Sequence, residues 1–255
     1  MNIVLIISVL MTVFSASESR PPRKKMDLYL LIGQSNMAGR GKLDSAAVLE
    51  REGIWVIQAD NSWTAAKDPV HYDKPKMVGI GPGLAFAEEI RKASGRPIGL
   101  IPCAVGGSRL DDWATGRRHE QTGIYAYDAM LARVKEAQKR GRLKGILWHQ
   151  GEGDSTPELA AVYGQKLSAF FERLRKDIGA EKVPVLIGTL GDFYVRKNPR
   201  AADINKIIEG FPVPGDHIYV VSSSGLTDLG DGTHFDGPSA RELGRRYAEQ
   251  YLKIK

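Results

Sequence analysis

The chain has 255 residues, 42% of them hydrophobic and 26% charged, which is typical of a folded globular protein rather than a disordered one. Its 28 glycines and 13 prolines follow no repeat, so a collagen-like chain is excluded. A single cysteine, Cys103, excludes a disulfide scaffold and a cysteine-built zinc site. The net charge of +6 is modest, so we interpret it as a solvated basic surface and predict no nucleic-acid partner.

The first residues form an uncharged, mostly apolar run, NIVLIISVLMTVFSA over residues 2–16. This run is too short to span a bilayer comfortably, which takes about 20 residues, and the small residues Ser15 and Ser17 suit a cleavage site. We therefore predict a signal peptide over residues 1–17 and a polar linker over 18–25. The protein would be secreted or periplasmic, with no stable membrane insertion after cleavage. An uncleaved membrane anchor and a buried first strand are the alternatives.

From residue 26 onward, short apolar runs alternate with longer amphipathic stretches. Several runs are continuously apolar, as parallel strands covered on both faces are. The runs lie at residues 28–32, 54–57, 98–102, 145–148, 183–190 and 217–221. Apolar residues three and four apart predict helices over 83–94, 125–140, 157–178 and 238–252. The alternation predicts one domain over 26–255, an α/β fold built as a three-layer α/β/α sandwich with a mainly parallel sheet.

Two polar segments follow the first and last of these strands, at the sheet edge where such folds bind ligands. The first is GQSNMAGRG over residues 33–41, in which Ser35 stands on a glycine-flanked turn that can present its hydroxyl. The second is DGTH over residues 231–234. Asp231 lies three residues before His234 and can orient its imidazole. Taken alone, each segment also fits a plain turn or a helix-capping loop.

The segment WHQGEGD, residues 148–154, permits two kinds of chemistry. The Gln150 amide at a strand end can donate a hydrogen bond to a developing oxyanion. Alternatively, His149, Glu152 and Asp154 could chelate a metal, which would make the protein a metal-dependent phosphoesterase. Strand alternation sends His149 and Gln150 to opposite sides, which disfavours the metal hypothesis.

A fourth segment, CAVGGS over residues 103–108, places the pair Gly106–Gly107 after another strand. Glycine N–H groups in such a turn can line an oxyanion site. The four segments converge on one sheet edge and together supply a nucleophile, a base, an orienting carboxylate and oxyanion donors. This combination is what acyl transfer requires.

Four side chains close to these segments are candidates to border a sugar. They are Arg40, Arg109, Asp112 and Trp113. Surface solvation is the preferred interpretation for each of them.

In chain order, GQSNMAGRG, AVGGS, WHQGEGD and DGTHFD resemble the motifs of the SGNH-hydrolase superfamily. More narrowly, they resemble its sialate O-acetylesterase-like branch, which includes the acetylxylan esterases of carbohydrate esterase family six. The resemblance runs from about residue 28 to the end of the chain. It implies a flavodoxin-like SGNH hydrolase fold.

The resemblance also implies residue roles. Ser35 would be the nucleophile, His234 the general base and Asp231 its partner, with Glu152 as an alternative acid. The oxyanion hole would consist of the Ser35 N–H, the Gly107 N–H and the Gln150 side chain.

The implied activity is that of a serine carbohydrate esterase that removes O-acetyl groups through an acetyl-enzyme intermediate, with no metal or organic cofactor. The expected partner is an acetylated carbohydrate: xylan, sialic acid or a related glycan. A non-catalytic carbohydrate-binding protein on the same fold is an alternative. The sequence leaves the glycan and the oligomeric state open.

Overall fold

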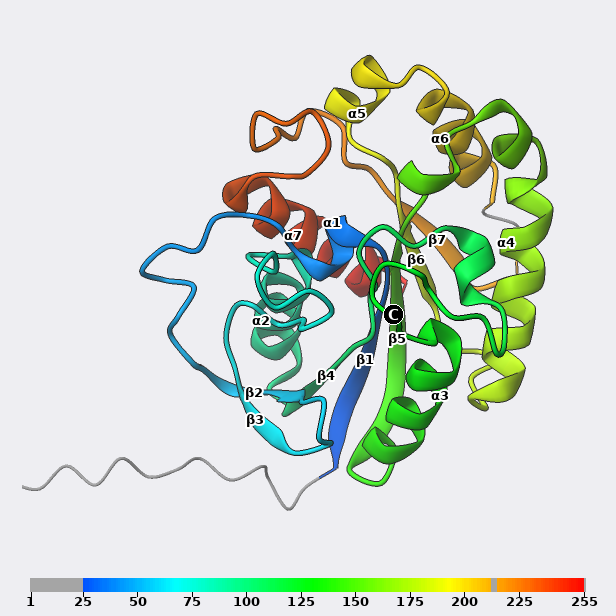
Figure 1. The fold of residues 1–255 in the computed structure, drawn as a ribbon. Coiled ribbons are helices and arrows are strands. Elements are labelled where there is room, and N and C mark those ends of the chain that lie inside the picture. The colour runs from blue at the N-terminus through cyan, green and yellow to red at the C-terminus, as the bar shows by residue number, and fades with distance from the viewer. Residues whose placement is uncertain (1–24, 212–214, 255) are drawn as a thin grey trace, which may run out of the picture.

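The computed structural model describes residues 25–211 and 215–254, which form a central sheet between two layers of helices (Figure 1). The predicted signal peptide, and the predicted linker up to residue 24, lie outside these residues and stay predictions. Within the two described ranges, no helix is both long enough and apolar enough to cross a membrane.

The described residues form one seven-stranded sheet in the order β3-β2-β4-β1-β5-β6-β7. Its strands are β1 (Met26–Gly33), β2 (Arg51–Ile57), β3 (Trp63–Ala66), β4 (Ile98–Pro102), β5 (Gly141–His149), β6 (Val185–Gly188) and β7 (Ile218–Val221). Only β3 is antiparallel to its neighbour; every other pairing in this sheet is parallel. Without the β2–β3 edge, the remaining order is the 2-1-3-4-5 order of flavodoxin-like sheets, so the predicted fold class is confirmed.

Helices cover both faces of the sheet (Figure 1). One layer holds α1 (Ser35–Ala38), α2 (Pro82–Ser94) and α7 (Gly237–Lys253). The other holds α3 (Ala126–Ala137), α4 (Pro157–Asp177) and α6 (Ala201–Glu209). The short helix α5 (Asp192–Lys197) and the 3₁₀ turns η1 (Leu110–Trp113) and η2 (Glu152–Asp154) lie in loops that follow strands.

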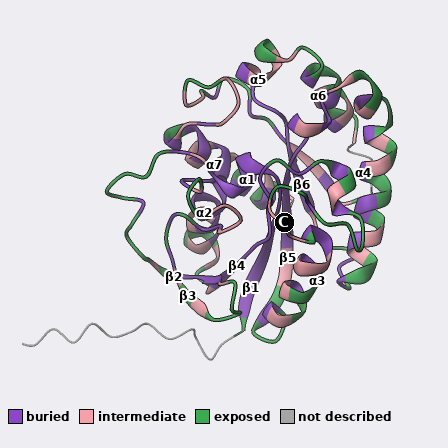
Figure 2. Ribbon diagram, viewed as in Figure 1, coloured by how far each residue is buried: buried purple, intermediate pink, exposed green. Residues whose placement is uncertain are grey.

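Strand β1 separates two hydrophobic cores. Leu28, Leu30 and Ile32 pack on the α3–α4 side, while Tyr29 and Leu31 pack on the α2–α7 side. All of them are fully buried, and the sheet is buried along most of its length in Figure 2. This two-sided burial explains why the strand is a continuous apolar run in the sequence, without the polar alternation of a half-exposed strand.

The four predicted helices are present with ends shifted by up to three residues. Sequence patterns did not reveal β3, α5 or α6, which are short. Trp113, interpreted as a surface residue, is fully buried, and its ring packs against Trp148 with centroids 5.5 Å apart. That prediction was wrong because η1 turns the indole into the core below the loop.

Candidate active site

A sharp turn after β1 places Ser35. Gly33 has φ +126°, and a Cβ at this position would lie 2.1 Å from the carbonyl oxygen of His149 on β5. Only glycine fits here, and the next residue, Gln34, donates its N–H to the same carbonyl at 2.9 Å. Ser35 then begins α1 between β1 and β5, where the strand order reverses and parallel sheets bind their ligands.

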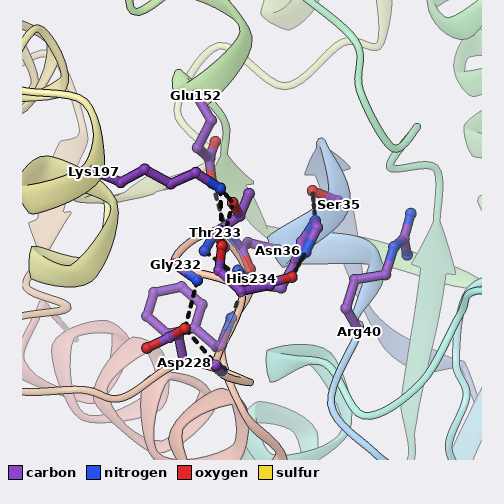
Figure 3. Close-up of polar contacts among 12 residues, drawn as sticks. Ser35, Asn36, Arg40, Glu152, Lys197, Asp228, Gly232, Thr233 and His234 are labelled. Carbon is purple, nitrogen blue, oxygen red and sulfur yellow. Dashed lines mark hydrogen bonds and ion pairs between the residues drawn. The ribbon is translucent and has the colours of Figure 1, made fainter.

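The hydroxyl of Ser35 lies beside His234 (Figure 3). His234 is in turn hydrogen-bonded to Asp231, so the three side chains form a series. Ser35 Oγ is 3.1 Å from His234 Nε2, and His234 Nδ1 is 2.7 Å from Asp231 Oδ2. Asp231 Oδ1 accepts the backbone N–H groups of Thr233 at 2.8 Å and His234 at 2.9 Å. The structure thus brings the three predicted residues together.

The pKa of Asp231 fixes the direction of these bonds. Desolvation raises this pKa, but the hydrogen bonds from His234 and from the backbone outweigh it and hold the pKa below its usual range. An ionised carboxylate only accepts hydrogen bonds, so Nδ1 of His234 carries the proton. In the neutral imidazole, Nε2 then has the lone pair that can accept the proton of the Ser35 hydroxyl.

Two charged side chains that the sequence analysis did not identify form hydrogen bonds with the loop that carries His234. Lys197 on α5 donates to the Asp231 carbonyl at 2.8 Å and to Thr233 Oγ1 at 2.7 Å. Asp228 accepts the Gly232 N–H at 2.6 Å (Figure 3). These contacts fix the turn between Asp231 and His234.

Asn36, the neighbour of Ser35, forms hydrogen bonds with the residues on both sides of His234. Its amide donates to the Thr233 carbonyl at 3.0 Å and accepts the Phe235 N–H at 3.1 Å. The same amide donates to Glu152 Oε1 at 2.5 Å. Among the contacts of the described residues, the Glu152 carboxylate therefore bonds to Asn36 and not to His234.

Of the pair Gly106–Gly107 after β4, only Gly107 has an N–H without an acceptor among the described residues. Val105, Gly106 and Ser108 donate their N–H groups inside the protein at 3.0, 2.7 and 3.1 Å, with Asp73 as the acceptor for Gly106. Gly107 is exposed with φ +85°, and within the described ranges no acceptor takes its N–H. This leaves Gly107, rather than Gly106, available to a ligand.

The amide of Gln150, predicted as an oxyanion donor, is bonded to other groups inside the protein. It is fully buried, and its Nε2 lies 2.5 Å from Asp154 Oδ2, 3.2 Å from the Ser108 carbonyl and 3.3 Å from Gln34 Oε1. Its Oε1 accepts the Tyr163 hydroxyl at 3.0 Å. An amide has two N–H bonds, and both are committed here. The structure makes Gln150 a buried link between loops and does not present it to a substrate.

The three side chains of the metal hypothesis have separate partners. His149 packs its ring on Phe235, Glu152 bonds to Asn36, and Asp154 accepts from Gln150 and from the Leu110 N–H. Among the described residues, no three His, Cys, Asp or Glu side chains gather where they could hold a metal ion. The ligand cluster that a metal-dependent phosphoesterase would need is therefore absent from this part of the chain.

A polar cleft of about 460 Å³ opens beside Gly107. Its lining is rich in charged and amide groups: Arg109, Asp111, Asp112, Arg117, His119, Glu120 and Gln121, with Gly107, Gly153 and Leu159. Arg109 and Asp112 were candidates to border a sugar, and both lie here.

A serine, an imidazole and a carboxylate in hydrogen-bonded series are the groups that serine hydrolases use, and here they lie at the switch point of a flavodoxin-like sheet, where such folds bind ligands. Residues 25–253 match the model of a family described as carbohydrate esterase, sialic acid-specific acetylesterase. The chain belongs to this family, and it is accordingly a carboxylic ester hydrolase.

Individual relatives agree with this assignment. A probable carbohydrate esterase of Arabidopsis thaliana is 29% identical over 258 residues, which cover 92% of this chain and 94% of the relative. The solved structure of an Arabidopsis thaliana protein superposes with a TM-score of 0.80 at 27% identity, over 90% of this chain and 98% of that one. NanS gives a TM-score of 0.72 at 16% identity, over 92% of this chain and 98% of that one, and shows the shared fold.

Replacing Gln150 tests its buried role. We expect Gln150→Ala to lower the free energy of unfolding by about 2–4 kcal/mol, because Asp154, Tyr163 and the Ser108 carbonyl lose a buried partner. Urea denaturation measures this change. Unchanged stability combined with a loss of kcat of about 10²–10³-fold would instead restore Gln150 as an oxyanion donor.

The stability of the fold should depend on the ionisation of Glu152. Burial raises the pKa of this carboxyl from 4.5 to about 7. The folded state therefore keeps a proton that the unfolded chain loses, so stability falls as the pH rises from about 4.5 to about 7.

Glu152→Gln keeps the oxygen that accepts from Asn36 and removes the charge. It should match the wild type at pH 4 and exceed its unfolding free energy by about 3 kcal/mol at pH 8. Denaturation at both pH values measures the difference, with the exposed Glu249→Gln as a matched control. An equal effect of Glu152→Gln at both pH values would contradict the prediction.

Proposed function

We propose that the protein removes O-acetyl groups from carbohydrates by a serine-esterase mechanism, with Ser35 as nucleophile, His234 as general base and Asp231 as the carboxylate that orients it. The observation that carries this proposal is the unbroken series from Ser35 Oγ to His234 Nε2 at 3.1 Å and from His234 Nδ1 to Asp231 Oδ2 at 2.7 Å. Membership of a carbohydrate esterase family supports the acetyl ester as substrate.

In the proposed acylation step, Ser35 Oγ attacks the acetyl carbonyl carbon while its proton passes to His234 Nε2. Asp231 stabilises the imidazolium that forms. The bond between the acetyl carbon and the sugar oxygen then breaks. The proton on Nε2 moves to that oxygen, which leaves acetyl-Ser35 and a free sugar hydroxyl.

Deacylation repeats these roles with water in place of the serine hydroxyl. His234 takes a proton from the attacking water, the tetrahedral intermediate collapses, and the proton returns to Ser35 Oγ as acetate leaves. Every proton transfer therefore uses the same nitrogen, Nε2, since Nδ1 stays bonded to Asp231.

The negative oxygen of each tetrahedral intermediate needs donors that are in place beforehand. We assign this role to the backbone N–H groups of Ser35 and Gly107. Both lack an acceptor among the described residues, and both lie after neighbouring parallel strands. Gln150 is not included, because its amide is already committed.

The cleft beside Gly107 is our candidate for the sugar site. Its charged and amide side chains can exchange hydrogen bonds with sugar hydroxyls, and it adjoins one of the proposed oxyanion donors. Acetylated xylan and O-acetyl sialic acid are the substrates to compare first.

The central test is acetate release from these two substrates and from 4-nitrophenyl acetate. Ser35→Ala should lower kcat by about 10⁵–10⁶-fold on every ester that the wild type cleaves, because no other hydroxyl replaces the nucleophile. Ser168→Ala, an exposed serine on α4, is the matched control and should keep full activity. Retention of activity by Ser35→Ala would end the proposal.

Comparison of two carboxylates tests the role of Asp231. Asp231→Asn should lower kcat by about 10³–10⁴-fold, because the amide can stabilise the wrong imidazole tautomer. Glu152→Gln should stay within about tenfold of the wild type, since its carboxylate contacts Asn36 instead. Steady-state kinetics on 4-nitrophenyl acetate measure both. The reverse order of losses would assign the orienting role to Glu152.

A further inference from the structure

A buried ion pair lies beside the glycine turn and takes no part in the proposed proton transfers. Arg40 Nη2 is 3.3 Å from Asp73 Oδ2, and the two side chains are only 5% and 2% exposed. Asp73 belongs to the loop between β3 and α2, and Arg40 follows α1, near the end of the segment 33–41 that carries Ser35. The sequence-based interpretation of Arg40 as a surface residue was wrong, because the guanidinium turns inward to meet this carboxylate.

The pair connects the nucleophile segment to the glycine turn. Asp73 Oδ2 accepts the Gly106 N–H at 2.7 Å as well as the contact from Arg40. Arg40 Nη1 donates to the Gly39 carbonyl at 2.8 Å, and the Gly39 N–H donates to the Ser35 carbonyl at 2.9 Å. One carboxylate thus fixes the distance between two segments that follow different strands.

The Arg40–Asp73 ion pair packs directly against Gly106 and leaves no room for a side chain at that position. A Cβ on Gly106 would lie 2.1 Å from Arg40 Nη2 and 2.9 Å from Asp73 Oδ2. The space that a side chain would occupy is therefore filled by the ion pair. This contact explains why a residue without a side chain stands at position 106.

The bond to Asp73 also determines which N–H of the turn remains free. Neighbouring peptide planes share a Cα, so fixing the Gly106 N–H limits the direction of the Gly107 N–H. Without Asp73, the Gly106 N–H would lose its acceptor and the turn could rotate. A lone carboxylate near a developing oxyanion would repel it, and Arg40 supplies the compensating charge.

We propose that Asp73 is a positioning residue of the esterase site: it holds Gly106 so that the Gly107 N–H faces the ester, and Arg40 neutralises its charge. This inference rests on the proposed function, in which Gly107 is an oxyanion donor. It assigns a task to two residues that contact neither Ser35 nor His234 through their side chains in any hydrogen bond of the described residues.

The first test separates the acceptor from the charge. Asp73→Ala should lower kcat on 4-nitrophenyl acetate by about 10²-fold with KM changed less than about threefold, because the loss falls on the transition state. Asp73→Asn keeps an oxygen that can accept the Gly106 N–H and should recover kcat to within about tenfold of the wild type. Equal kcat for Asp73→Ala and wild type, or no recovery by Asp73→Asn, would overturn the proposal.

A matched control is another buried carboxylate paired with an arginine among the described residues. Asp27 lies 2.8 Å from Arg96 with 5% of its side chain exposed, near the opposite end of β1 from Ser35. Asp27→Ala should lower the melting temperature but leave kcat unchanged. A loss of kcat in Asp27→Ala equal to that in Asp73→Ala would show that both losses reflect general destabilisation.

The second test concerns the charge and needs no alanine variant at position 73. Arg40→Met leaves the Asp73 carboxylate uncompensated and should lower kcat by about 10–100-fold. The double variant Arg40→Met/Asp73→Asn removes both charges and should be more active than Arg40→Met alone. A double variant no better than Arg40→Met would refute the neutralising role. Activity that persists in Ser35→Ala would instead refute the proposed function itself.

Discussion

The close approach of β1 to β5 at the end of the first strand is the constraint on which the site depends. A Cβ on Gly33 would lie 2.1 Å from the His149 carbonyl oxygen, so the two strands can meet here only through a glycine. The chain then reverses into α1 within two residues and leaves Ser35 between the strands, at the point where the sheet order changes direction. A side chain at this turn would separate the strands and move the hydroxyl away from His234.

Around this turn, the site is assembled from segments that are distant in sequence. Ser35 and His234 are 199 positions apart, and their contact is held by Asn36, which bonds to both neighbours of His234. The segments that carry the proposed nucleophile and base are therefore joined twice, once through the Ser35–His234 contact and once through the amide of Asn36. Because Asn36 sits on the buried, packed helix α1, this second link is rigid, and rigidity is what a preorganised site requires.

Periodicity predicted the fold well because both sheet faces are covered, which makes the strands continuous apolar runs and the helices one-sided. The Asp231–His234 contact was also predictable, since the two residues are three positions apart in one turn. The hydrogen-bond partners of the Gln150 amide were not predictable, because they include the Ser108 carbonyl and the Tyr163 hydroxyl, which belong to other segments of the chain. Asp73 had no local pattern at all: its partners, Arg40 and Gly106, each lie 33 positions away.

Three of the carboxyl groups around the site, those of Asp231, Glu152 and Asp73, have environments that suit three different tasks. Asp231 has 45% of its side chain exposed and orients the imidazole of His234. An ionised group is needed there, and the exposed carboxylate stays hydrated, so its desolvation cost is small. Glu152 and Asp73 are buried and hold an amide and a backbone N–H. Burial of a charged carboxylate carries a desolvation cost. For Asp73 the ion pair with Arg40 offsets this cost, whereas Glu152 avoids part of it because its raised pKa favours the uncharged, protonated form. In the proposed mechanism, this cost is tolerated because Asn36 and Gly106 donate short hydrogen bonds to buried carboxyl groups. Such bonds position the two residues more firmly than bonds to exposed, hydrated carboxylates could.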